Sequence, residues 1–241
     1  QAGLNNLHGL FEVTDRIFQV RGFDLANMTI IQGDTGLIIV DPLTSEETAE
    51  AALALVREHL GDVPVVAVIF THSHIDHFAG AWGVINRDDY DAGKVRVIAP
   101  IGFMDEATSE NIIAGTAMAR RASFMYGRRL AKGPHGHVGS GLGKSPAYGT
   151  FGIATPTEII DTTGQRLNID GLDFVFQNAP GSEAPAELTF GIPELAAYCG
   201  AEIATRTMHN LYTLRGTKVR DALKWSAYID EIIDLSADSD V

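Results

Sequence analysis

The feature that most restricts the fold is an uninterrupted apolar run, VPVVAVIF, at residues 63–70. A strand with one face in water alternates apolar and polar residues, whereas a strand covered on both faces stays apolar throughout. The run therefore predicts a central strand with layers packed on both sides. KVRVIAP at residues 94–100 predicts a neighbouring strand of the same sheet.

Three strands and a helix are predicted before this run. RIFQVRG, which ends at Gly22, NMTIIQGD at 27–34 and GLIIVDP at 36–42 have strand composition, and GDTG at 33–36 supplies a turn. Residues 44–61 predict a helix that starts at a capping-box pattern, Thr44 with Glu47, and ends at Gly61. Its apolar positions share one face: Ala49, Ala52, Leu53, Val56 and Leu60.

The second half of the chain alternates in the same way. A helical region is expected at about 103–130, followed by a Gly-, Pro-, Ser- and Lys-rich loop at 131–160. Two or three strands are expected within 158–180 and a strand pair within 186–202. A last helix at 217–235 carries apolar positions on one side: Val219, Ala222, Leu223, Ile229 and Ile233, with Ser226 among them. This order predicts an α/β layered domain whose sheets are covered by helices.

Composition excludes several classes of function. The formal net charge of −13 disfavours a nucleic-acid partner. Cys199 is the only cysteine, so an internal disulfide is impossible. No apolar stretch approaches the roughly 20 residues of a transmembrane helix. The start, QAGLNNLHGLFEV, lacks the form of a signal peptide, and because cleavage would remove such a signal, the compartment stays open.

The segment THSHIDH, residues 71–77, directly follows the central strand. Residues two apart on a strand point the same way, so His72 and His74 converge, while Asp76 and His77 lie just beyond, where the chain turns toward a helix expected near Phe78. These ligands are too many for one tetrahedral ion that keeps an open position. They suit two ions roughly 3.5–4 Å apart. Asp41 ends the 36–42 strand and is expected to hold a ligand histidine in place.

The HxHxDH pattern, preceded by NMTIIQGDTGLIIVDP, resembles the metallo-β-lactamase superfamily. The resemblance implies an αββα sandwich with a metal cleft along the sheet edges. The usual PGH loop and GD pair are replaced here by NAPGSEAPAELTF at 178–190 and YCGAE at 198–202. Glu183 therefore stands near the usual histidine and Glu202 near the usual aspartate, and Glu187 competes with Glu183.

PGSEAPAE and the later segment TMHNLYTLRG resemble the zinc-dependent alkylsulfatases, and this resemblance runs from about residue 10 to the end. It implies hydrolysis of small amphiphilic sulfate esters to alcohol and sulfate at a site with two zinc ions. The implied zinc ligands are His72, His74, Asp76, His77, Glu183 and Glu202. The resemblance also implies a sulfate contact by Arg215 and a proton-donor role for His209. Asp76 is a further catalytic candidate, and Asn210 and Tyr148, the latter in the Gly-rich loop, are further candidates for substrate contact.

Physical arguments support two of these roles independently. The planar guanidinium of Arg215 fits two sulfate oxygens, and its charge persists at any relevant pH. His209 can protonate a departing oxygen as an imidazolium. In contrast, His135 and His137 lie in a Gly-rich loop without a rigid strand, so we do not expect them to bind metal.

Two other functions stay open at this point: a thioester or lactone hydrolase of the same fold, and a non-catalytic metal-binding fragment. The superfamily's last metal histidine normally follows the final helix, and none of the eight histidines fills that place. We therefore expect residues 1–241 to be one metal-binding domain, incomplete at its C-terminal side and without the family's dimerisation and lipid-binding-like regions. The resemblance implies a homodimeric full-length protein, periplasmic or secreted. It leaves open whether attack falls on sulfur or on carbon.

Overall fold

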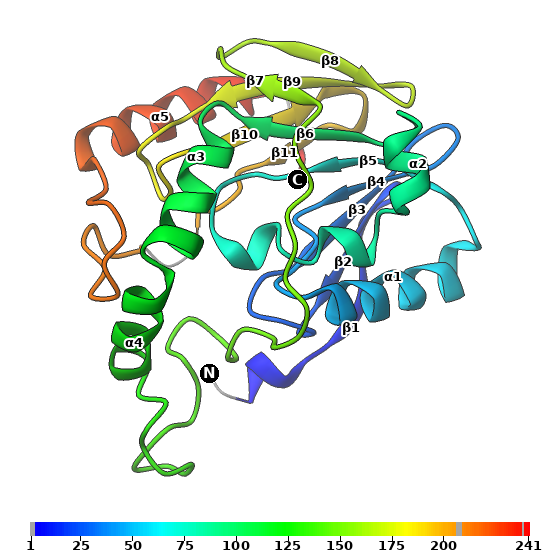
Figure 1. Cartoon of the computed structure of the whole chain (residues 1–241). Coiled ribbons are helices and arrows are strands. Elements are labelled where there is room, and N and C mark those ends of the chain that lie inside the picture. The colour runs from blue at the N-terminus through cyan, green and yellow to red at the C-terminus, as the bar shows by residue number, and fades with distance from the viewer. Residues whose placement is uncertain (1–2, 206–208, 238) are drawn as a thin grey trace.

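The computed structural model describes residues 3–205, 209–237 and 239–241. Within these residues the chain forms two β-sheets that face one another, with helices on their outer sides (Figure 1). This layer order confirms the predicted αββα sandwich. Among the helices of the described residues, none is both long and apolar enough to span a bilayer.

The first sheet has seven strands that lie side by side in sequence order. They are β1 (Gly9–Thr14), β2 (Ile17–Arg21), β3 (Met28–Gln32), β4 (Leu37–Val40), β5 (Val65–Ile69), β6 (Arg96–Pro100) and β7 (Glu158–Ile160). Pairing is antiparallel from β1 to β4 and parallel from β4 to β7. Because β4 and β5 are parallel, their carboxyl ends meet at one edge, which brings Asp41 beside residues 71–77.

The second sheet is antiparallel, with the strand order β11-β10-β9-β8. Its strands are β8 (Arg166–Ile169), β9 (Leu172–Asn178), β10 (Leu188–Ile192) and β11 (Ala197–Cys199). The β9–β10 loop carries Glu183, and Glu202 follows β11. Both glutamates therefore belong to the connections of the second sheet rather than to its strands.

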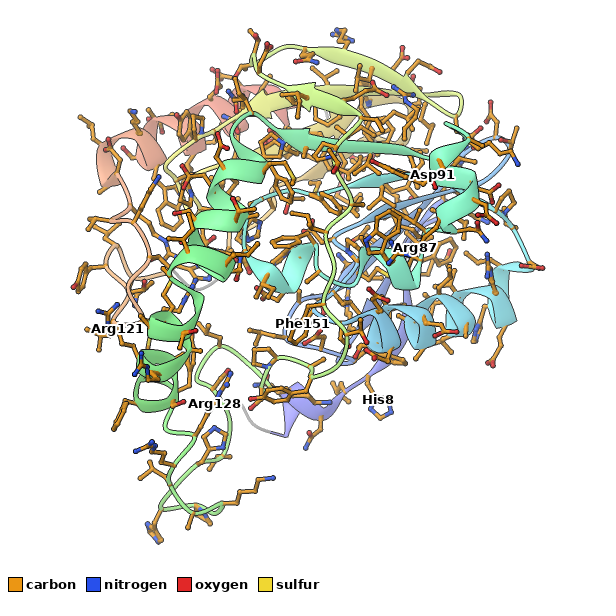
Figure 2. All side chains as sticks on the ribbon, in the orientation of Figure 1. His8, Arg87, Asp91, Arg121, Arg128 and Phe151 are labelled. Carbon is orange, nitrogen blue, oxygen red and sulfur yellow. The ribbon has the colours of Figure 1, made fainter. Side chains whose placement is uncertain are left out.

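Five α-helices and several short turns complete the described chain. The helices are α1 (Glu46–Leu60), α2 (Arg87–Asp91), α3 (Phe103–Thr108), α4 (Gly115–Met125) and α5 (Ala222–Leu235). A π-helical turn, Ser109–Ile113, joins α3 to α4. From this turn, α4 and the loop after it extend away from the sandwich (Figure 1). Arg121 and Arg128 lie along this extension (Figure 2).

Three hydrophobic clusters fill the three interfaces between layers. In β4, Leu37 and Ile39 pack toward α1, whereas Ile38 and Val40 pack between the sheets. β5 divides in the same way, so the continuous apolar run is a strand buried on both faces, as predicted. A smaller cluster seats α5 on the second sheet through Trp225 and other side chains.

The predicted capping box at the start of α1 is wrong. The cap is Ser45, whose side chain accepts a hydrogen bond from the Thr48 N–H at 3.3 Å. The Thr44 N–H instead donates to the buried carboxylate of Asp24 at 2.8 Å. Glu47 does not complete the capping box either, because its carboxylate accepts hydrogen bonds from the N–H and hydroxyl of Thr150. Contacts with distant segments therefore take both residues of the predicted capping box, and the cap moves to Ser45.

The helix predicted near Phe78 is also wrong. Two short 3-10 turns, η2 (Ile75–His77) and η3 (Ala81–Gly83), occupy this place. A β-carbon on Gly80 would lie 2.2 Å from the Pro42 carbonyl oxygen, and one on Gly83 would lie 2.1 Å from the Glu46 carbonyl oxygen. The segment therefore packs tightly against the start of α1, which glycine allows because it has no β-carbon. Short 3-10 turns form here instead of the predicted helix.

The last helix is shorter than predicted and presents its faces differently. It starts at Ala222 rather than at 217, with Asp221 as its cap. Trp225 and Ile232 face the sheet, whereas Leu223 and Ile233 of the expected apolar side are 80% and 63% exposed. The helical region at 103–130 is confirmed but divided in three, and the sequence analysis missed β1 and α2.

Candidate metal centre

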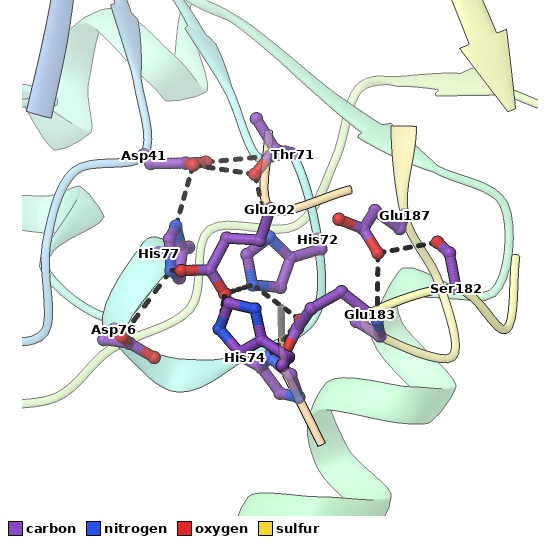
Figure 3. Close-up of polar contacts among 12 residues, drawn as sticks. Asp41, Thr71, His72, His74, Asp76, His77, Ser182, Glu183, Glu187 and Glu202 are labelled. Atoms are coloured by element: carbon purple, nitrogen blue, oxygen red, sulfur yellow. Dashed lines mark hydrogen bonds and ion pairs between the residues drawn. The ribbon is translucent and has the colours of Figure 1, made fainter. Parts of the chain in front are cut away.

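The six side chains predicted to bind metal come together where the edges of the two sheets meet (Figure 3). Four follow β5 within residues 72–77, and the other two are Glu183 and Glu202. Each is within 4 Å of another member of the set. Three distant parts of the chain thus converge on one cluster.

One half of the cluster centres on His72. Its Nε2 lies 3.6 Å from Glu183 Oε2 and 3.6 Å from Glu202 Oε2. Ligand atoms around a tetrahedral zinc ion are about 3.4 Å apart when the bonds are near 2.1 Å. His74 belongs to the same group, whose ligand atoms all lie within 4.8 Å of one another. Its Nδ1 is 2.9 Å from Glu183 Oε2, so these two atoms must separate by about half an ångström to share an ion.

The other half centres on His77. Its Nε2 lies 3.5 Å from Asp76 Oδ2 and 3.7 Å from Glu202 Oε1, which again match tetrahedral ligand separations. The two oxygens of Glu202 thus face different histidines, Oε2 toward His72 and Oε1 toward His77. This carboxylate spans both halves of the cluster.

Asp41 fixes the tautomers of two histidines. Its Oδ2 is 2.8 Å from His77 Nδ1, and because an ionised carboxylate only accepts, Nδ1 carries the proton, so in the neutral imidazole Nε2 has the lone pair. The same oxygen accepts the Thr71 hydroxyl proton at 2.7 Å, so that hydroxyl accepts in turn from His72 Nδ1 at 2.9 Å. His72 Nε2 is left with a lone pair as well. This is the supporting role predicted for Asp41.

The buried polar atoms test whether the cluster fits a metal. His72 Nε2, His77 Nε2 and Glu183 Oε2 are buried and lack a hydrogen-bond partner within the described part of the chain. Buried polar atoms are normally paired, since an unsatisfied one costs about 1–3 kcal/mol. Here the unpaired atoms converge, and imidazole nitrogen with carboxylate oxygen is a donor set that zinc accepts. The residues fit divalent metal.

The electrostatics of the cluster are those of crowded, buried charges. Burial lowers the pKa of His72 well below its usual value, and the neighbouring His77 and His74 lower it further. Burial raises the pKa of Glu183, but the charge and hydrogen bond of His74, together with the charges of Arg220 and His209, outweigh this and bring the pKa to about 2. Burial raises the pKa of Glu202, and the negative charges of Glu183 and Asp76 raise it further. Together these effects outweigh the lowering by the charge of His77, and the pKa of Glu202 is about 7. A cation at this point offsets the repulsion among the carboxylates.

Glu187 does not take the ligand role that was open to it. Its Oε2 accepts hydrogen bonds from the Ser182 hydroxyl at 2.8 Å and from the Ala184 N–H at 2.9 Å. Burial and the charge of Glu183 raise its pKa well above the usual value. Glu187 therefore shapes the loop that presents Glu183.

The residues predicted to act on substrate lie at different distances from the cluster. His209 contacts the cluster, with Nε2 at 3.8 Å from Glu202 Oε2. Arg215 Nη1 lies 3.5 Å from Glu110 Oε2, a buried carboxylate on the π-helical turn. Asn210 is exposed and accepts a hydrogen bond from Arg220 at 3.1 Å. Thr207 and Met208 of this segment lie outside the described residues.

The remaining candidates are not brought to the cluster. Tyr148 is 72% exposed, and its hydroxyl accepts a hydrogen bond from Arg128 at 2.8 Å. His135 and His137 belong to neither group of potential metal ligands that the described residues form.

Arg220 is the residue of this region that the sequence analysis missed. It is buried, and its guanidinium contacts the carboxylate of Glu183. No spacing rule in the segment TKVRDALK indicates this role, because the two residues are 37 positions apart.

The sequence model described as the metallo-beta-lactamase superfamily matches residues 21–158, which contain the HxHxDH segment. The chain belongs to the metallo-beta-lactamase superfamily. The metallo-beta-lactamase IND-7 shares its fold, with a TM-score of 0.55 over 96% of this chain and 87% of that one at 15% identity.

Within the superfamily the chain is most usefully compared with alkylsulfatases. It is 52% identical over 238 residues to a linear primary-alkylsulfatase of Pseudomonas sp, covering 99% of this chain and 35% of that one. It is 49% identical over 230 residues to an alkyl/aryl-sulfatase of Saccharomyces cerevisiae, covering 95% and 36%. The structure of the stereoselective inverting sec-alkylsulfatase Pisa1 from Pseudomonas sp. superposes with a TM-score of 0.94 at 47% identity, over 100% of this chain and 38% of that one. The chain spans about a third of the length of these curated relatives.

Proposed function

We propose that this chain is the metal-binding part of a zinc-dependent alkylsulfatase, which hydrolyses alkyl sulfate esters to alcohol and sulfate. The observation that carries the proposal is the ligand set. Glu183 and Glu202 stand where the superfamily usually has histidine and aspartate, and both lie against His72. The 52% identity to a linear primary-alkylsulfatase supports the same substrate class.

In this proposal two zinc ions divide the cluster. His72, His74 and Glu183 would hold one ion, Asp76 and His77 would hold the other, and Glu202 would be shared between them. When bound, zinc supplies a Lewis acid and a water of lowered pKa. Among the six side chains, the second ion has fewer unshared ligands than the first. We propose that a histidine from outside this sequence completes it.

Two residues act on the substrate rather than on the metal. Arg215 binds the sulfate group through its planar guanidinium, which suits two oxygens at once. His209 donates a proton to the departing oxygen. Burial lowers the pKa of His209, so the imidazole is mainly neutral until an anionic substrate raises its pKa again.

The test is zinc content together with sulfate release from dodecyl sulfate, measured on this chain and on a chain extended past Val241. We expect two zinc ions and turnover in the extended chain, and weaker binding of the second ion with little turnover in the short one.

His209→Ala in the extended chain should lower kcat by roughly 10²–10⁴. Zinc binding with turnover of thioesters or lactones instead of sulfate esters would refute the substrate class. Hydrolysis in ¹⁸O-labelled water assigns attack, since label enters sulfate for S–O cleavage and the alcohol for C–O cleavage.

A further inference from the structure

Arg220 is a buried cation with partners on separate segments of the chain. It is only 7% exposed, although an arginine side chain is normally solvated. A buried charge is costly unless it is paired and its donors are satisfied. The identity of those partners therefore shows why the charge is inside.

The first partner is the metal-ligand candidate Glu183. The Nε of Arg220 donates to the Glu183 carbonyl oxygen at 2.6 Å, and Nη2 donates to the carboxylate oxygen Oε1. The other carboxylate oxygen, Oε2, faces His72 at 3.6 Å and His74 at 2.9 Å. One oxygen of Glu183 is thus held by the guanidinium, and the other is directed at the ion position.

The second partner is the segment that carries His209. Nη1 of Arg220 donates to the Asn210 carbonyl oxygen and, at 3.1 Å, to its side-chain oxygen Oδ1. The backbone N–H of Arg220 donates a hydrogen bond to the Leu211 carbonyl oxygen at 2.9 Å. Because Asn210 directly follows His209, one guanidinium ties a metal ligand to the neighbour of the proton-donor candidate.

Only an arginine can make these contacts together. Its fork presents five N–H donors in one plane, of which Nε and Nη2 meet Glu183 while Nη1 meets Asn210. The Trp225 ring lies 5.8 Å from the guanidinium carbon and helps to close the site from α5. A lysine in this place keeps the charge but offers a single point of attachment.

We propose that Arg220 is a positioning residue that makes Glu183 a one-oxygen ligand of the first metal ion and fixes this ligand relative to His209. The proposal rests on the metal site put forward above. Removing a partner that orients a ligand typically costs 10- to 100-fold in metal affinity. The loss should fall on the ion held by His72, His74 and Glu183.

The experiment compares Arg220→Lys with Arg96→Lys, a matched change at another arginine–glutamate pair. Arg96 makes two hydrogen bonds to Glu158, at 2.5 and 2.8 Å, in the first sheet and away from the cluster. The zinc dissociation constant is measured by competition with a chromophoric chelator, and the thermal midpoint is measured on the metal-free chain. We expect Arg220→Lys to weaken the tighter zinc ion by 10- to 100-fold and Arg96→Lys to change it by less than twofold.

A second variant separates the two arms of Arg220. Asn210→Ala removes the Oδ1 contact and leaves both contacts to Glu183, so zinc affinity should stay within about threefold of the wild type. This variant also keeps the proposal testable if Arg220→Lys fails to fold, because a loss of affinity as large as tenfold would contradict the assigned division.

The outcomes distinguish this inference from the proposed function. A wild-type chain that binds no zinc overturns both. A wild-type chain that binds zinc, with Arg220→Lys binding it equally tightly and losing only thermal stability as Arg96→Lys does, overturns the positioning role alone. Selective loss of zinc affinity in Arg220→Lys supports it, even if dodecyl sulfate proves not to be the substrate.

Discussion

Asp41 offers the sharpest test of the metal centre, because one carboxylate orients histidines on both sides of it. Asp41→Asn is nearly isosteric and suits the backbone, whose φ of 56° is tolerated by aspartate and asparagine. If the remaining oxygen keeps its bond to the Thr71 N–H, at 2.8 Å in the wild type, the new NH₂ group takes the place of Oδ2. A donor then faces His77 Nδ1 and the Thr71 hydroxyl, where an acceptor stood before.

The exchange of acceptor for donor inverts both tautomers. His77 Nδ1 must accept, which moves its proton to Nε2. The Thr71 hydroxyl now accepts from the introduced NH₂ group and donates to His72 Nδ1, which moves that proton to Nε2 as well. Each ion position loses a ligand lone pair. A lost orienting partner costs 10- to 100-fold in metal affinity, or about 1.4–2.7 kcal/mol for each ion.

The assay is zinc competition at pH 7.5, with Asp170→Asn as the matched control. Asp170 also has a positive φ, 46°, and its carboxylate also accepts from a threonine N–H and hydroxyl, those of Thr35. It lies in the β8–β9 turn, outside the metal cluster. Asp170→Asn should lower stability and leave zinc affinity unchanged. Equal zinc affinity in Asp41→Asn and the wild type would refute the tautomer argument.

Three further predictions follow from the same geometry and from the core. Glu202→Gln leaves one acceptor oxygen between His72 and His77, so bound zinc, counted by metal analysis, should fall from two ions toward one. The pKa of Glu202 is raised to about 7 and that of His77 is also raised, so both groups hold protons near neutrality. Zinc must displace these protons, so zinc affinity should fall as the pH drops from 8 to 6. An affinity that does not change over this range would contradict the prediction. Phe174 is fully buried between the sheets, so Phe174→Ala should lower the free energy of unfolding by about 3–5 kcal/mol in urea denaturation, and a loss below about 1 kcal/mol would show that the cavity collapses.

Local patterns were enough to predict the layers and most of the candidate metal ligands. The apolar run at 63–70 alone predicts that β5 is buried on both faces, because each of its side chains has to face one of two covered surfaces. The spacing of His72, His74, Asp76 and His77 is equally local, since all four leave the same strand end. Glu183 and Glu202 were reached through a family resemblance, and the structure now places both beside His72.

The features that were missed depend on contacts between distant segments. Nothing near Thr44 shows that its N–H is taken by Asp24, 20 residues earlier. Nothing in the segment at 78–83 shows that Gly80 lies against the Pro42 carbonyl. Arg220 reads as a surface charge beside a helix until the fold brings it to Glu183. In each case the contacting residue is set by the tertiary packing of distant segments, which sequence periodicity does not predict.

The way Glu202 spans the cluster has a consequence for how the site fills. Its two oxygens face His72 at 3.6 Å and His77 at 3.7 Å, and His209 approaches the first of these oxygens at 3.8 Å. In the proposed two-ion site, an ion on either side would displace the proton from this carboxylate and fix its orientation, which would lower the cost of binding on the other side. By thermodynamic linkage the effect is reciprocal, so if two ions bind as proposed, we expect them to load cooperatively, with an isotherm steeper than that of two independent sites. We therefore expect a substitution at Glu202 to change the affinity for both proposed ions and the surroundings of His209 together.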